Sequence, residues 1–223
     1  MNKINQLDLQ DIIKNSKIPI KKELIKLKDS YSYFIMGYWI DKFDIDDQTF
    51  SIFSEIIIIK DYVNASCMLA HLNYFEQANG LLRVAFEKEL RIICQIINPQ
   101  FGFDGNGKFK VEQSIDQLAK EFKNNVMINF IKDRYYNKFY KKLCQPIHNP
   151  ISSITDSFID ELPQYSRYDY DKYLGNFKYY IEISVELILI TAIYCNIDIQ
   201  DITPHKKIFA DDIDAIIKIN NLF

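Results

Sequence analysis

Hydrophobic and polar positions alternate along this chain with the spacing of α-helices. Apolar residues recur at intervals of three and four over long stretches, which places them on one face of a helix. Gly and Pro number only 6 each, too few for the many tight turns of a sandwich or a barrel. The pattern therefore predicts an all-α protein. The predicted helices cover residues 7–14, 19–43, 50–72, 75–97, 111–122, 126–145, 170–194 and 210–219.

The helix predicted over residues 170–194 has the clearest core-facing row, which runs from Leu174 to Cys195 at three- and four-residue spacing. The elements together predict a helical bundle of four to five main helices with an N-terminal helical extension. Three regions follow from this pattern: an extension over residues 1–49, a bundle over 50–195, and a tail over 196–223 with one short helix.

The helix predicted over residues 75–97 carries charges at helical spacing. Arg83 and Glu87 are four residues apart, as are Glu87 and Arg91, so both pairs are candidates for ion pairs. Glu89 instead falls in the middle of the apolar face. A carboxylate there needs a partner or else its pKa rises, so we expect a partly buried polar interaction on this helix.

Charge is spread unevenly over a chain whose net charge is only −3. Basic residues dominate residues 14–28 and 123–142, whereas acids dominate 156–171. A local basic surface on an acidic protein favours a selective site for an anion over general binding of nucleic-acid backbones. The N-terminal basic run has a simpler interpretation as a solvated face.

The cysteines and the N-terminal residues indicate the cellular compartment in which the protein is expected. Cys67, Cys94, Cys144 and Cys195 lie far apart without a CxxC pair, which indicates buried thiols in a reducing environment. No apolar signal segment opens the chain, and the most apolar run, 187–195, is too short to span a bilayer. We therefore expect a soluble cytoplasmic protein without membrane partners. No cluster has metal-ligand spacing, and no cofactor is expected.

The helix predicted over residues 126–145 carries the main chemical pattern. At 100° per residue, three cations and one histidine fall within about 80° of one another, and apolar residues occupy the other side. The polar set is Arg134, Lys138, Lys141 and His148, and the apolar set is Ile128, Tyr135, Phe139 and Leu143. Because cations hold a phosphate and an imidazole moves a proton, this face suits cleavage of a phosphodiester.

His148 differs from the other two histidines. His71 lies within an apolar helical segment and His205 in a surface turn, so both are expected to be structural. Pro146 and Pro150 restrict the backbone around His148. Two interpretations of His148 stay open: a catalytic group, or a cap at the C-terminal end of the helix, where the dipole favours a cation.

Two segments resemble the HEPN superfamily of bacterial defence and toxin proteins. They read Leu-Leu-Arg-Val-Ala-Phe-Glu over 81–87 and Tyr-Lys-Lys-Leu-Cys-Gln-Pro-Ile-His-Asn over 140–149, and residues 70–78 resemble the junction between that family's first helices. The resemblance covers roughly residues 50–195. It implies a helical bundle that dimerises across a cleft shared by two histidine motifs, and a metal-independent ribonuclease of toxin–antitoxin or abortive-infection systems.

In the family, four to six residues separate an arginine from the histidine, and this chain departs from that pattern because Lys141, Lys142 and Leu143 stand at those positions. Lysine is a point charge and does not clamp phosphate in a bidentate way. Arg83 or Arg134 would then supply a guanidinium.

The hypothesis for function is an endoribonuclease in which His148 acts as general base on a ribose 2′-hydroxyl or as acid to the leaving oxygen. Lysine and arginine side chains stabilise the phosphate charge, and Glu87 orients Arg83. Tyrosines offer surfaces on which unpaired bases stack. The expected catalytic set is His148, Lys141, Lys142, Arg83 and Glu87, and the expected substrate contacts are Arg134, Lys138, Tyr140 and Asn149, with Tyr135 and Tyr136 as further stacking surfaces.

Two alternatives use the same bundle. One is an inactive dimerising scaffold that binds RNA, a nucleotide or a partner protein, which the lysine at the arginine position favours. The other is docking of an antitoxin or a sensor subunit on the basic N-terminal helix. The expected partners are thus RNA, with tRNA as one candidate, a second copy of the chain, and such a subunit.

Overall fold

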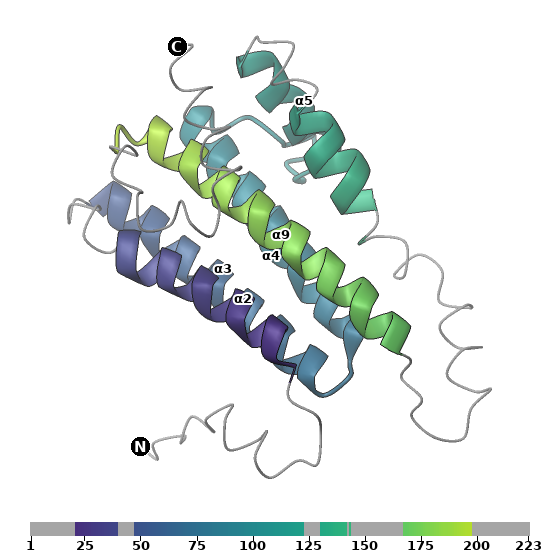
Figure 1. Ribbon diagram of the computed structural model, residues 1–223. Coiled ribbons are helices and arrows are strands. Elements are labelled where there is room, and N and C mark those ends of the chain that lie inside the picture. The colour runs from purple at the N-terminus through teal and green to yellow at the C-terminus, as the bar shows by residue number, and fades with distance from the viewer. Residues whose placement is uncertain (1–20, 40–46, 123–129, 142, 144–166, 198–223) are drawn as a thin grey trace, which may run out of the picture.

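The long apolar segments fold into helices that pack side by side (Figure 1). The computed structural model describes residues 21–39, 47–122, 130–141, 143 and 167–197. Its helices are α2 (Lys22–Tyr33), η1 (Phe34–Trp39), α3 (Asp47–His71), α4 (Phe75–Ile97), α5 (Val111–Phe122), η2 (Phe130–Tyr140) and α9 (Arg167–Tyr194), where η marks a π-helix. The prediction of an all-α bundle with an additional N-terminal helix is confirmed.

The central helix of the bundle is α9. Every residue from 183 to 192 is buried, so this part of the helix is enclosed on all sides, as a helix segment apolar all round must be. It contacts α4, α2, α3 and η2, and Figure 1 shows it running between α2 and α3 on one side and α5 on the other. The predicted core-facing row is buried up to Ala192, whereas Cys195 is half-buried.

The break between α3 and α4 lies where the sequence predicted it. Asn73 adopts a left-handed conformation, with φ at 68°. The N–H of Tyr74 donates to the Leu69 carbonyl (2.9 Å) and that of Asn73 to the Ala70 carbonyl (3.1 Å). These two bonds form a Schellman motif, which satisfies the last carbonyls of α3 and turns the chain into α4. The turn thus places the start of α4 beside the end of α3.

Residues 130–140 form a π-helix, so the predicted α-helix is wrong over this range. A π-helix bonds each residue to the fifth along the chain instead of the fourth. Faces assigned at 100° per residue therefore do not hold in η2. Its apolar side chains still reach the core, because Tyr135 and Phe139 are buried, as is Leu143 beyond its end.

The glycine-rich segment between α4 and α5 is a loop, as predicted. Gly102 has φ at 77°, and a Cβ there would collide with the Phe109 ring. The Phe103 and Phe109 rings pack edge to face at 5.5 Å, and the Arg91 guanidinium lies 5.8 Å from the Phe103 ring centre. Arg91 thus lies over this loop, and the predicted Glu87–Arg91 ion pair does not form.

Several single-residue predictions are confirmed in the described part of the chain. His71 is buried, and its Nδ1 lies 3.2 Å from the Cys67 carbonyl. Burial raises the pKa of both the Cys67 and the Cys94 thiol to about 12.

Among the described helices, none has an apolar stretch long enough to cross a membrane. The remaining predictions, on the helices at 7–14 and 210–219 and on Cys144 and His205, lie outside the described residues.

Candidate functional site

Three predicted site residues meet at the interface between α4 and η2. The Arg83 Nε donates to Glu87 Oε1 at 2.8 Å, and the Tyr140 hydroxyl donates to the same oxygen at 2.8 Å. Arg83 Nη2 in turn donates to the Tyr140 hydroxyl at 3.3 Å. The three side chains therefore form a closed ring of hydrogen bonds. Arg83 and Glu87 stay partly exposed, at 24% and 34% of their side-chain surface.

Aromatic packing beneath this ring holds the two helices together. Phe86, on α4, meets Phe139 edge to face at 5.4 Å and lies 5.8 Å from the Tyr140 ring. Phe139 also lies 5.8 Å from the Tyr180 ring of α9. Because Phe86 and Phe139 are buried, the position of Tyr140 is set by the core and not by a surface contact.

A second tyrosine extends the site along η2. The Tyr136 and Tyr140 rings stack at 6.1 Å with 20° between their planes. The Lys141 ammonium lies 4.8 Å from the Tyr136 ring centre and donates to Asn137 Oδ1 at 3.0 Å. Lys138 is exposed on the same helix. Half-buried rings flanked by cations suit a stacked base beside a phosphate. The third tyrosine, Tyr135, is buried, so its predicted role as a stacking surface is wrong.

Arg134 lies against α9 and not with Arg83. Its Nη2 is 3.0 Å from Glu186 Oε1 and 3.5 Å from Glu182 Oε2, and the guanidinium lies 5.5 Å from the Tyr179 ring centre. The Tyr179 hydroxyl also donates to the Arg134 carbonyl at 3.0 Å. The Glu186 side chain is only 1% exposed, so the contact is a buried charge pair that joins η2 to α9. The guanidinium contacts of Arg134 are therefore made with α9.

Glu89 is enclosed in the core, as its place in the apolar face predicted. The Tyr180 hydroxyl donates to Glu89 Oε1 at 3.0 Å, and the Ser184 hydroxyl donates to the same oxygen. Tyr31, from α2, is 2.6 Å from the Ser184 hydroxyl. Glu89 Oε2 has no hydrogen-bond partner among the described residues. Burial raises the pKa of Glu89 to about 8, although the two hydroxyls oppose this shift.

The rest of the predicted site lies beyond the residues described. His148, Lys142 and Asn149 are all in this group. The site that the structure places is thus the pair of helices α4 and η2, with Arg83, Glu87 and Tyr140 together and Lys141 next to them. In the described ranges, no three His, Cys, Asp or Glu side chains gather in a way that could hold a metal ion.

Sequence reasoning missed the partners of these groups. Nothing local links Glu89 to Tyr180 and Ser184, which lie 91 and 95 residues further along the chain. The sequence does carry a signal for Glu186, because a carboxylate at the edge of the most apolar run needs a cation. Lys21, which precedes α2 and bonds to carbonyls at the end of α3, gave no signal in the sequence beyond its charge.

Comparison with protein-family models finds no family that matches this chain. Comparison with curated proteins and with solved structures finds no match either.

Proposed function

We propose that this chain is a metal-independent endoribonuclease of a phage-defence or toxin system, with His148 as the general acid or base. The observation that carries the proposal is the ring of Arg83, Glu87 and Tyr140, built across two helices. A guanidinium fixed by a carboxylate is a preorganised ligand for a phosphate. The HEPN-like segments at 81–87 and 140–149 contain these three residues and His148.

The described residues suggest how RNA is held. Arg83 contacts the phosphate, and Glu87 and Tyr140 fix its orientation. Tyr136, partly buried and beside Lys141, takes an unpaired base on its face. Lys138 and Lys141 add positive charge along η2, and Lys142 and Asn149 are the further residues proposed to contact the RNA. A local cationic surface of this kind binds one RNA segment on a chain whose net charge is −3.

Cleavage then needs only proton transfer and charge stabilisation. His148 takes the proton from a ribose 2′-hydroxyl, whose oxygen bonds to the neighbouring phosphorus as the bond to the 5′-oxygen breaks. The leaving 5′-oxygen takes a proton from water or from the protonated His148 of a second copy of the chain. The guanidinium stabilises the negative charge that grows on the phosphate oxygens. In a dimer, the second copy of the chain brings its own histidine to the same cleft.

A second candidate is an inactive scaffold that binds RNA or a partner protein. It is favoured by the ion pair between Arg83 and Glu87, which compensates the guanidinium charge in the absence of a ligand. The two candidates differ in one outcome. The scaffold binds RNA and leaves it intact, whereas the nuclease cuts it.

Substitutions at Arg83, Glu87 and Tyr140 distinguish cleavage of RNA from binding without cleavage. The purified chain is incubated with single-stranded RNA in the presence of EDTA, and kcat/KM is measured. We expect Arg83→Lys to lower kcat/KM by roughly 10²-fold, because an ammonium cannot replace two guanidinium contacts. Tyr140→Phe and Glu87→Gln should lower it less, because each leaves part of the ring.

Arg91→Lys is the matched control, since Arg91 is on the same helix but lies over the Phe103 ring. It should leave kcat/KM unchanged. Equal losses in Arg83→Lys and Arg91→Lys would contradict the site. RNA that binds but stays intact with the unaltered chain would favour the scaffold.

A further inference from the structure

Lys21 makes the densest set of polar contacts of any lysine in the described part of the chain. Its ammonium donates to the Ala70 carbonyl at 2.8 Å, to the His71 carbonyl at 3.1 Å and to Asn73 Oδ1 at 2.7 Å. An ammonium has three N–H donors, so each one has an acceptor. Two of the acceptors are carbonyls at the end of α3 and the third is Asn73, in the turn that follows, all about 50 residues away along the chain.

The end of α3 is built to receive a cation. The last carbonyls of a helix carry partial negative charge, which a cation at that position stabilises. Asn73 adopts its left-handed conformation here, and this brings its side-chain amide oxygen beside the two carbonyls. The Ala70 carbonyl accepts both from the Asn73 N–H and from Lys21, which uses both of its lone pairs.

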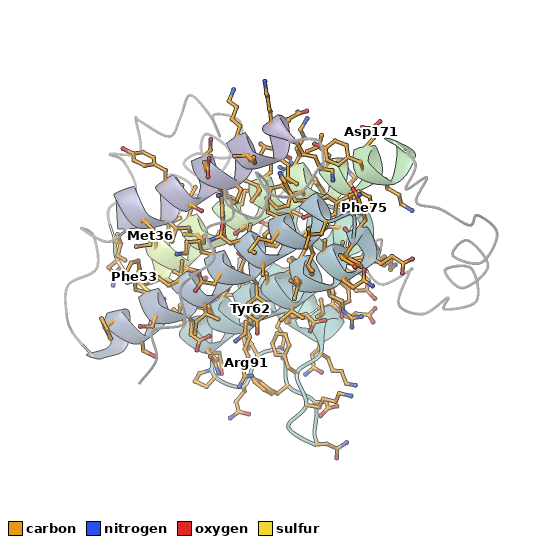
Figure 2. The ribbon with its side chains drawn as sticks, turned by 90° about the horizontal axis from the view of Figure 1, so that it is seen from below. Met36, Phe53, Tyr62, Phe75, Arg91 and Asp171 are labelled. Atoms are coloured by element: carbon orange, nitrogen blue, oxygen red, sulfur yellow. The ribbon has the colours of Figure 1, made fainter. Side chains whose placement is uncertain are left out.

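Two aromatic rings complete the enclosure. The Lys21 ammonium lies 5.3 Å from the Phe75 ring centre and 5.4 Å from that of Tyr170. These rings come from the first turns of α4 and α9 and pack against each other at 6.3 Å. Figure 2 shows Phe75 and Asp171 at the same end of the bundle, opposite the end that holds Met36 and Phe53. Oxygen acceptors on one side and ring faces on the other form a cage for a primary ammonium group.

The cage also shields the charge from part of the surrounding water, since Lys21 is half-buried. This burial lowers the pKa of Lys21. The neighbouring His71 does not compete with Lys21 as a cation at this helix end. Burial also lowers the pKa of the His71 imidazole and so favours its neutral form.

We propose that the α3–α4 junction, with Asn73, Phe75 and Tyr170, is a binding site for a primary ammonium group, which Lys21 fills in cis. The occupied cage fastens the start of α2 to the ends of three other helices. A free alkylammonium or another lysine side chain can bind at this site only by displacing Lys21, which would release the start of α2. This proposal is independent of the ribonuclease, since none of its residues belongs to the site on α4 and η2.

The proposal is tested by removing the Lys21 side chain and then supplying a free ammonium compound in solution. Lys21→Ala in the full chain removes the occupant and should lower Tm by roughly 3–6 °C, because several hydrogen bonds are lost. Added n-butylammonium should then restore Tm with a saturable dependence, since a ligand that binds only the folded state stabilises it by mass action. 1-Butanol and tetramethylammonium should not restore it, because they lack the charge or the N–H donors.

Lys22→Ala is the matched control, because Lys22 is the next residue and is exposed. It should leave Tm near that of the unaltered chain and show no response to n-butylammonium. Equal effects of Lys21→Ala and Lys22→Ala would overturn the proposal, as would rescue by 1-butanol.

A second measurement applies if Lys21→Ala does not fold. In the unaltered chain, ring currents from Phe75 and Tyr170 should shift the Lys21 ε-methylene protons upfield in NMR spectra. Asn73→Gly keeps the left-handed backbone but deletes one acceptor, so it should reduce this shift. A Lys21 signal at the position of the exposed lysines would overturn the proposal.

Discussion

At the scale of single residues, Glu89 shows what a carboxyl does in a helical core. Two hydroxyls donate to one of its oxygens, and no cation is among the causes that set its pKa. Desolvation therefore dominates, and the group stays protonated near neutral pH. A buried carboxyl of this kind makes stability depend on pH.

The sign of that dependence follows from the raised pKa. The folded chain keeps the Glu89 proton up to about pH 8, while an unfolded chain releases it near 4.5. The stabilising contribution is therefore present below 4.5 and is lost as pH rises toward 8. The slope is at most about 1.4 kcal/mol per pH unit for one proton.

We predict that Glu89→Gln raises the free energy of unfolding at pH 8 more than at pH 6. Glutamine keeps an oxygen that accepts from Tyr180 and Ser184 but never ionises. Urea unfolding at the two pH values measures the effect, with Glu76→Gln on the same helix as an exposed control. A gain that is equal at both pH values would show that Glu89 titrates normally.

The sequence could predict that Glu89 is buried, but not what surrounds it. A carboxylate at the centre of an apolar arc is a local signal, and it needs only the spacing of α4. Its two partners both come from α9, and one of them, Ser184, is bonded in turn to Tyr31 of α2; no local pattern links those helices to α4. The same holds for Arg83 and Glu87, whose spacing predicted their ion pair but not the Tyr140 hydroxyl between them.

At the scale of elements, η2 is positioned from both sides. Phe139 and Tyr140 attach it to α4, and Arg134 attaches it to α9 through Glu186.

The type of the η2 helix was not predictable, because the same apolar spacing fits an α-helix over this range. The bounds of α4 and α5 were predicted because long amphipathic segments end at clear breaks, Asn-Pro in one case and a glycine-rich loop before the other.

We predict that Arg134→Met destabilises the chain by about 3 kcal/mol, because it removes the cation that lies 3.0 Å from the buried Glu186 carboxylate. Adding Glu186→Gln to that variant should recover most of the loss, since the buried carboxylate charge is then removed as well. Chemical unfolding of the single and double variants measures this.

Lys132→Met is the control on the same helix. Its ion pair with Asp116, at 2.6 Å, is about half exposed on both sides, so the cost should stay below about 1 kcal/mol. If the double variant were as unstable as Arg134→Met, the arginine would act through packing and not through charge.

At the scale of the whole molecule, the bundle separates three tasks. The core around α9 buries Glu89, one end holds Lys21 in its cage, and the surface of α4 and η2 carries the proposed RNA site. Only the last bears on catalysis. The proposed function is therefore a chemical one: we propose that this chain cleaves RNA through the ribose 2′-hydroxyl, with His148 moving the proton.

The most direct test is the chemistry of the products. An RNA with one 2′-deoxy nucleotide at a cleavage position is incubated with the purified chain in EDTA, and the fragment ends are identified by mass spectrometry. The account predicts fragments ending in a 2′,3′-cyclic phosphate and a 5′-hydroxyl, none at the deoxy position, and none at all with His148→Ala, while His205→Ala still cleaves. Fragments with 5′-phosphate ends, cleavage at the deoxy position, or intact RNA throughout would contradict it.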